Sequence, residues 1–136
     1  MAVEQTLVIV KPDAMRRRLA GEILRRFEQK GLDIVRLKVG TISESLAREH
    51  YQHHADKPFF PELLASITAG PVIFAVLEGP NAIRLVRNIV GATNPLEAAP
   101  GTIRGDYACA LPDNLVHASD SPETAKVEIE RFFGRD

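Results

Sequence analysis

The sequence predicts an α+β domain in which helices pack on a four-stranded antiparallel sheet. Short apolar runs alternate along the chain with segments whose apolar residues recur at helical spacing. The 136 residues, 45% of them hydrophobic, are enough to bury one sizeable core. No internal repeat, linker or low-complexity segment divides the chain, so we expect residues 1–136 to form a single domain.

Four apolar runs predict the strands. Thr6–Val10 is apolar and β-branched and stops at a Lys-Pro pair, which is typical of a buried strand. Ile34–Val39 alternates as a half-buried strand does, whereas Pro71–Leu77 is apolar throughout. Leu115–Val116 begins the last strand.

The segments between these runs predict five helices, and Gly31 and Gly91 end two of them. They are Gly21–Lys30, a helix capped by Ser43 that includes Leu46, His50 and Tyr51, then Pro61–Thr68, Pro80–Val90 and Pro122–Phe133. The proline- and glycine-rich segment Ala92–Asp113 is predicted to be irregular. A loop of this length in a small domain is usually functional or disordered.

This order of elements fits a ferredoxin-like split βαβ core with added helices. In that arrangement strands one and three are adjacent at the centre of the sheet. Many unrelated proteins share this core, so it does not identify a function.

Composition excludes some classes of partner. The net charge of −1 favours neither nucleic acid nor an anionic membrane surface, so nucleic acid is not an expected partner. No apolar stretch reaches membrane length, so no membrane partner is expected. The single Cys109 cannot form a disulfide within the chain, which fits a cytoplasmic location.

The stretch from Asn114 to Ser121 carries the strongest chemical signal. A short apolar run delivers His117, and hydroxyls and a carboxylate follow it at once, before Ser121-Pro122 opens a helix. A neutral imidazole is nucleophilic at neutral pH, and its bond to a phosphoryl group is labile enough to pass that group on. The stretch therefore suggests a phosphohistidine.

The chain has no glycine-rich phosphate-binding motif of the P-loop or dinucleotide type. Side chains must therefore hold any bound phosphates. The candidates stand at the ends of predicted elements or in the long loop, and they are Lys11, Arg87, Thr93 and Arg104.

Taken together, the motifs resemble the nucleoside diphosphate kinase family in order and spacing, over essentially the whole chain. The matching segments are Val10–Asp13, Lys57–Phe60, Ser66–Pro71, Thr93–Pro95, Pro100–Asp106 and Asn114–Ser121. The family usually has glycine where this chain has Ala14 and Ala118.

The resemblance implies catalytic roles for five residues. His117 matches the histidine that is phosphorylated in a ping-pong reaction, and Lys11 and Tyr51 match contacts to the transferred phosphate. Glu128 matches a carboxylate that orients the imidazole, and Ser119 matches a hydroxyl beside it.

The resemblance also implies a nucleotide site. Arg87, Thr93 and Arg104 match residues that hold the remaining phosphates, and Asn114 and Lys11 match contacts to the ribose hydroxyls. Phe59 matches the aromatic ring on which the base stacks, with Leu63 and Leu111 on its flanks. Because every base has a π-face, broad base and sugar tolerance is expected.

The implied cofactor is Mg²⁺ carried by the nucleotide phosphates. No protein ligand binds it directly, and Asp120 holds it through water. The implied partners are nucleoside tri- and diphosphates such as ATP and GTP. Further copies of the chain are also implied, in a tetramer or hexamer built from dimers.

Other patterns have simpler interpretations. His50 and His54 would share a helix face, but no third zinc ligand is evident in the sequence near them. Arg16–Arg18 is interpreted as a solvated turn, and Arg104-Gly105-Asp106 as part of a phosphate-binding loop. Two rival functions are a non-catalytic ferredoxin-like binding module, which would have lost the nucleophile, and a histidine phosphocarrier, which would not need Phe59, Asn114 and the arginines together.

Overall fold

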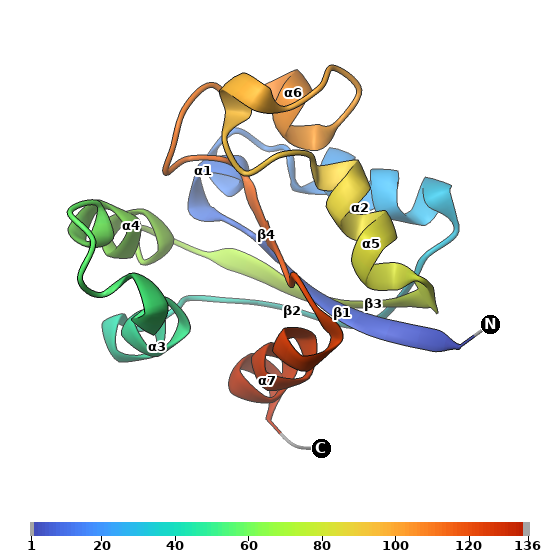
Figure 1. The fold of residues 1–136 in the computed structure, drawn as a ribbon, viewed down its shortest axis with the longest axis horizontal. Helices are drawn as coiled ribbons and strands as arrows, with labels where there is room; N and C mark the ends of the chain where they lie inside the picture. The colour runs from blue at the N-terminus through green and yellow to red at the C-terminus, as the bar shows by residue number, and fades with distance from the viewer. Residues whose placement is uncertain (1, 135–136) are drawn as a thin grey trace.

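The computed structural model describes residues 2–134 as one twisted antiparallel sheet with helices on both faces (Figure 1). The strand order is β2-β3-β1-β4, with β1 and β3 at the centre, as predicted. All three pairings are antiparallel. The strands are β1 (Val3–Val10), β2 (Asp33–Gly40), β3 (Val72–Pro80) and β4 (Val116–Ala118).

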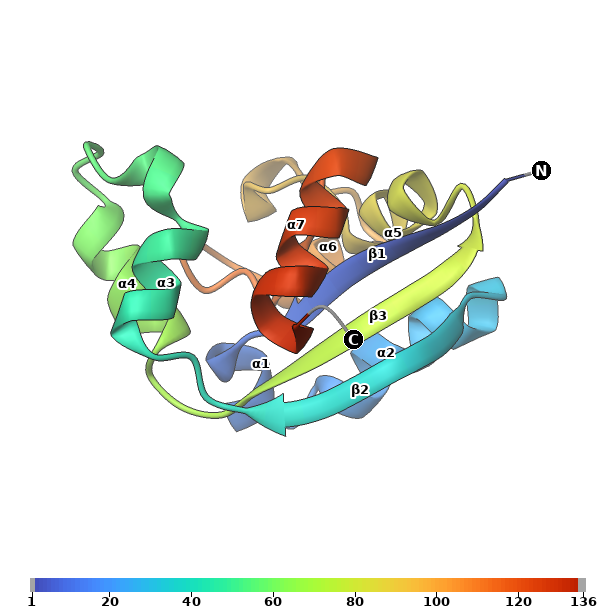
Figure 2. The same cartoon turned by 90° about the horizontal axis from the view of Figure 1, so that it is seen from below.

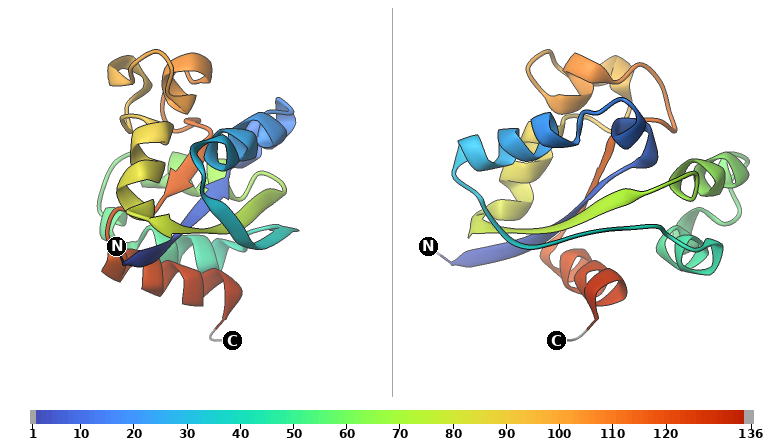
Figure 3. Two further views of the ribbon diagram at one scale, coloured as in Figure 1. Left: turned by 90° about the vertical axis from the view of Figure 1, so that its right-hand side faces the viewer. Right: turned by 180° about the vertical axis from the view of Figure 1, so that it is seen from behind.

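The helices divide between the two faces of the sheet. α2 and α5 cover one face, and α7 crosses the other (Figures 1 and 2). α3, η1 and α4 form a separate lobe beside α7, visible from two more sides in Figure 3. The helical bounds are α1 (Pro12–Arg16), α2 (Ala20–Lys30), α3 (Glu44–His50), η1 (Gln52–His54), α4 (Phe60–Ile67), α5 (Ala82–Val90), η2 (Pro95–Glu97), α6 (Ile103–Tyr107) and α7 (Pro122–Phe133).

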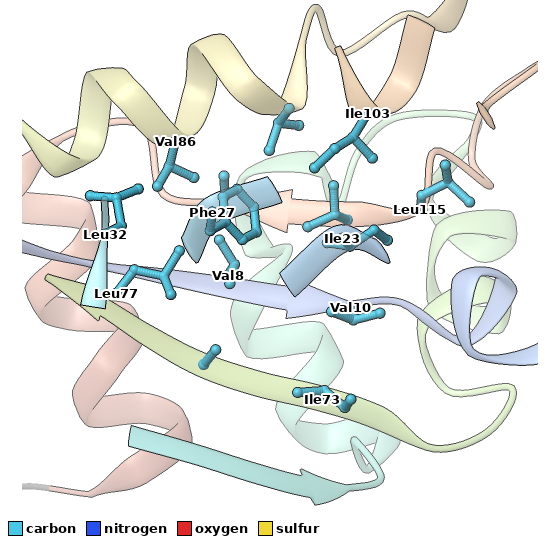
Figure 4. Packing of buried hydrophobic residues seen from close by; sticks show 14 of the residues in the cluster. Val8, Val10, Ile23, Phe27, Leu32, Ile73, Leu77, Val86, Ile103 and Leu115 are labelled. Atoms are coloured by element: carbon cyan, nitrogen blue, oxygen red, sulfur yellow. The ribbon is translucent and has the colours of Figure 1, made fainter. Parts of the chain in front are cut away.

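The two central strands are buried on both faces, which explains their continuous apolar runs. On the α2/α5 face, Val8 and Leu77 pack against Phe27 and Val86 (Figure 4). On the other face, strand residues such as Ile9 join a second cluster with side chains of α3, α4 and α7. The core therefore lies in two layers, one on each side of the sheet.

Local signals set most helix boundaries as expected. The Ser43 hydroxyl accepts a hydrogen bond from Leu46 N (3.1 Å) and the Ser121 hydroxyl one from Thr124 N (3.1 Å), so both predicted caps are confirmed. α5 begins later than predicted, because Pro80 still pairs with Val3 in the sheet.

The expectation of an irregular segment over residues 92–113 was wrong in part. It contains the 3₁₀ turn η2 and the short helix α6. Thr102 caps α6 by accepting a hydrogen bond from Gly105 N (2.9 Å). A Cβ added to Gly105 would lie 1.9 Å from Ala99 O, so the turn packs too closely for any larger residue. α1 was also missed, although Pro12 at its first turn is a recognised start signal.

The two alanines that replace the family's usual glycines fit their positions. Ala14 lies in α1, and Ala118 lies in β4 opposite Val8. Neither is among the positive-φ residues of the described chain. No glycine is needed at either position.

Among residues 2–134, no helix combines the length and apolar character needed to cross a membrane.

Candidate active site

A pocket of about 1060 Å³ opens between the α3–α4 lobe, the loop after α5 and the start of α7. Twelve residues predicted for the site from the sequence line it, from segments far apart in the chain. They are Lys11, Tyr51, Phe59, Leu63, Arg87, Thr93, Arg104, Leu111, Asn114, His117, Asp120 and Glu128. Only Ser119 of the predicted set is not among the lining residues.

Strand alternation directs His117 into this pocket. Val116 and Ala118 belong to the core on the α2/α5 face, so the residue between them faces the opposite side of β4. There the His117 side chain is 20% exposed, and its Nε2 lies 2.8 Å from Glu128 Oε1. The imidazole is thus hydrogen-bonded to Glu128 while it borders the open pocket.

Glu128 is fixed from a second direction. Its Oε1 also accepts a 2.6 Å hydrogen bond from the Ser119 hydroxyl, which is fully buried behind the pocket wall. Burial alone would raise the pKa of Glu128, but the hydrogen bond and charge of His117, followed by the Ser119 hydrogen bond, lower it overall. Glu128 is therefore a carboxylate at neutral pH and accepts the Nε2 proton of His117.

Lys11 enters the pocket from the end of β1. Its ammonium donates to Pro112 O (2.7 Å) and Asn114 Oδ1 (2.9 Å), and the Asn114 amide donates to Thr93 O (2.9 Å). Burial lowers the pKa of Lys11 to about 8, an effect that the nearby Asp13 opposes. These bonds join β1 to the long loop at one corner of the pocket.

Arg104 is anchored more deeply than its predicted role implies. It is 5% exposed and donates to the carbonyl oxygens of Asn114 (3.2 Å), Gly91 (3.0 Å) and Val116 (2.6 Å). Arg87 donates to Ala118 O (3.1 Å). Burial, followed by the charge of Arg87, lowers the pKa of Arg104 to about 10, so it remains a cation at neutral pH. The guanidinium groups of Arg87 and Arg104 are therefore both in the pocket wall, which also includes Arg131.

Apolar side chains line another part of the pocket. Phe59 is 46% exposed and Leu111 is 53% exposed, and both line it with Leu63. Tyr51 is buried, and burial, followed by the charge of Glu128, raises the pKa of its phenol, which stays protonated at neutral pH. The exposed ring of Phe59 can stack on a flat ligand group.

The sequence did not identify His50 and Arg131 as part of this site. His50 was expected to share a helix face with His54, but α3 ends at His50 and Tyr51 leaves the helical conformation. His50 instead packs against His117, with ring centroids 4.6 Å apart. The only sequence signal that His50 belongs to the site was its position directly before Tyr51. Nothing in the sequence pattern indicated Arg131.

His50, His117 and Glu128 place possible metal-ligand atoms within 4.8 Å of one another. Ser119 and Arg131 already donate to members of this group. The exposed Asp120 carboxylate, which lines the pocket, suits Mg²⁺ better because that ion prefers oxygen ligands and retains water.

The family model described as nucleoside diphosphate kinase matches residues 4–136. The chain belongs to the nucleoside diphosphate kinase family. It is therefore a phosphotransferase, a nucleotide-binding kinase like the rest of that family.

Named relatives agree over nearly the full length. A nucleoside diphosphate kinase of Rubrobacter xylanophilus is 58% identical over 132 residues, which cover 97% of this chain and 99% of the relative. One of Methanosarcina barkeri is 56% identical over 131 residues, covering 96% of this chain and 88% of the relative.

Solved nucleoside diphosphate kinase structures share the fold. The Encephalitozoon cuniculi enzyme in its apo form superimposes with a TM-score of 0.96 at 39% identity, covering 98% of this chain and 90% of that one. A halophilic enzyme from Halobacterium salinarum in complex with CDP gives a TM-score of 0.96 at 50% identity, covering 99% and 90%. The α+β, ferredoxin-like prediction is thereby confirmed.

Proposed function

We propose that this chain moves the γ-phosphate of a nucleoside triphosphate to a nucleoside diphosphate in two half-reactions, through a phosphohistidine on His117. The observation that carries the proposal is the orientation of the imidazole. Its Nε2 lies 2.8 Å from Glu128 Oε1 in the pocket wall, so the proton is on Nε2 and the lone pair is on Nδ1.

In the first half-reaction, the Nδ1 lone pair attacks the γ-phosphorus. The bond from that phosphorus to the β,γ-bridging oxygen breaks, and the nucleoside diphosphate leaves with the electron pair. The imidazole becomes positively charged, and the Glu128 carboxylate stabilises that charge through the Nε2 proton. In the second half-reaction, a terminal phosphate oxygen of the acceptor diphosphate attacks the same phosphorus and Nδ1 leaves.

The cations of the pocket fit a polyphosphate. The transferring phosphoryl group has a loose transition state, so positioning and charge neutralisation are the main tasks of the protein. Lys11, Arg87 and Arg104 line the same pocket as His117 and supply that charge. Mg²⁺ on the nucleotide phosphates would add further neutralisation, with Asp120 holding it through a water molecule.

We assign the base to the surface formed by Phe59, Leu63 and Leu111 and the ribose hydroxyls to Lys11 and Asn114. A stacking surface recognises every base, so we propose broad tolerance of purine and pyrimidine nucleotides and of ribose and deoxyribose. The halophilic relative in complex with CDP supports a site that accepts a pyrimidine nucleotide.

We also propose that residues 1–136 act as one domain in the cytoplasm and assemble into a tetramer or hexamer built from dimers. β2 is an edge strand with apolar side chains open to solvent: Val35 is 41%, Leu37 53% and Val39 65% exposed. Such an edge favours pairing with a second copy. A monomer mass by light scattering at micromolar concentration would contradict the assembly.

Initial rates with ATP and GDP test the mechanism. A ping-pong enzyme gives parallel double-reciprocal lines, and His117→Gln abolishes exchange while nucleotide affinity stays within a few-fold. Intersecting lines, or substantial exchange by the variant, would refute the proposal. No exchange by the wild-type chain would favour the rival in which the pocket only binds nucleotides.

A further inference from the structure

Behind the nucleophile, Arg131 on α7 contacts a buried histidine on α3. Arg131 Nη1 lies 2.9 Å from His50 Nδ1, and Arg131 Nε lies 3.0 Å from Glu49 Oε2. The His50 side chain is 2% exposed, whereas that of Glu49 is 59% exposed. The guanidinium therefore joins a surface carboxylate to a ring that lies against His117. α3 and α7 can be followed on this side of the sheet in Figure 2.

The chemistry of this contact determines the protonation state of His50. A guanidinium has N–H donors and no acceptor, so His50 Nδ1 must offer its lone pair to Arg131. The ring proton of a neutral His50 is then on Nε2. His50 Nδ1 also lies 3.8 Å from Glu128 Oε2, beyond hydrogen-bonding range, and it has no proton to donate there.

We propose that Arg131 is a positioning residue for phosphotransfer, because it keeps the proton of the His50 ring on Nε2 and so leaves the Glu128 carboxylate to His117. The proposal rests on His117 being the phosphorylated residue. Arg131 lines the pocket, but its guanidinium is bound to Glu49 and His50, so it acts through His50 and Glu128. Its binding to Glu49 fixes the guanidinium at this distance from His50.

The charged surroundings of His50 agree with a neutral ring. Its pKa is lowered to about 3, first by burial and then by the charge of His117 on β4, with smaller contributions from Arg131 on α7 and His53 on η1. Glu128 on α7 opposes them. A protonated His50 would place two cations 2.9 Å apart in a buried contact.

Loss of Arg131 frees His50 Nδ1 to carry the ring proton. In Arg131→Met, His50 Nδ1 has neither a donor nor a neighbouring cation, and Glu128 is the nearest carboxylate. A proton on Nδ1 is then stabilised by donation to Glu128 Oε2. The carboxylate becomes shared between two rings, so it stabilises the charge on His117 less well during transfer.

The expected kinetic effect is a loss of transfer rate. For Arg131→Met we expect a kcat about tenfold lower than that of the wild type, the size of effect produced by weakening a hydrogen bond to a charged group. The KM for nucleotide should change little, since the Arg131 guanidinium is bound to Glu49 and His50. A merely structural role would lower kcat without changing the tautomer of His50.

Three further variants separate these explanations. Lys126→Met removes an exposed cation from the same helix and should leave kcat and the His50 tautomer unchanged. Arg131→Lys keeps a cation and one donor and should restore part of the rate. In a His50→Gln background, Arg131→Met should cause no additional loss, because the proposed effect passes through His50.

The decisive measurement is the tautomer of His50 in the wild-type chain, read by NMR with ¹⁵N-labelled histidine in the absence of nucleotide. The chain has only four histidines, so the signals can be assigned by substitution. We expect an Nε2–H ring in the wild type and an Nδ1–H ring in Arg131→Met, neutral in both from pH 6 to pH 8. An Nδ1–H ring or an imidazolium in the wild type overturns the proposal, as does an Nε2–H ring in Arg131→Met.

This measurement does not depend on phosphotransfer, so it is separable from a failure of the phosphohistidine mechanism. If Arg131→Met does not fold, as judged by circular dichroism, the His50 tautomer measured in the wild-type chain still tests the proposal.

Discussion

Replacing Glu128 by glutamine removes a charge from the site while keeping its shape. Glutamine Oε1 can still accept from His117 Nε2 and from the Ser119 hydroxyl, which lie 2.8 and 2.6 Å from the present oxygen. What is lost is the charge that stabilises the imidazolium-like ring during transfer. A hydrogen bond to a charged group contributes about 1.5–3 kcal/mol, which corresponds to a loss of about 10- to 150-fold in kcat.

The assay is single-turnover transfer from ATP to His117, followed in a rapid-quench instrument. Glu130→Gln changes an exposed carboxylate on the same helix and should retain the wild-type rate. The KM for ATP should change little in Glu128→Gln, because the carboxylate contacts the imidazole and not the nucleotide. A transfer rate within twofold of the wild type would refute the reasoning that Glu128 supports the nucleophile electrostatically.

Further substitutions and pH changes test other parts of the site. Arg104→Ala should lower the free energy of unfolding by at least about 3 kcal/mol, since two buried carbonyls and one partly buried carbonyl lose a charged donor, and an unchanged urea midpoint would contradict this. Phe59→Ala should raise the KM for purine nucleotides about five- to tenfold, and less for pyrimidines; an equal effect on both would argue against stacking. A dideoxynucleotide, which lacks the 3′-hydroxyl proposed to reach Lys11, should be a poor substrate, and full activity with it would mean that the sugar site is misassigned. The pKa of Lys11 is lowered in the fold from 10.5 to about 8, so between these values the unfolded chain binds more protons and stability should rise with pH relative to Lys11→Met. Bound phosphates should raise that pKa, so calorimetry in buffers of different ionisation enthalpy should detect proton uptake on nucleotide binding above pH 8, and its absence would show that the ammonium is not near the phosphates.

The parts of the fold that the sequence predicted are those set by short-range rules. The apolar runs of β1 and β3 indicated central strands because both of their faces are buried, and Ser43 and Ser121 indicated helix starts through their capping hydroxyls. The helix α6 was missed because Thr102 caps it within a segment rich in helix-breaking residues.

The candidate site followed from motifs, but its supporting contacts did not. Arg104 was expected to hold phosphate, and periodicity gave no sign that it also holds three carbonyls from two distant segments. The hydrogen bond from Arg131 to His50 joins residues 81 positions apart. Contacts of this kind depend on how α3 and α7 pack, and no local sequence pattern encodes them.

The most direct test of the central claim is incubation of the chain with γ-labelled ATP, followed by acid or alkali treatment of the labelled protein. We expect label that is lost in acid, retained in alkali, absent from His117→Ala, and transferred to added GDP. Label that survives acid, or that persists in His117→Ala, would contradict phosphotransfer through His117.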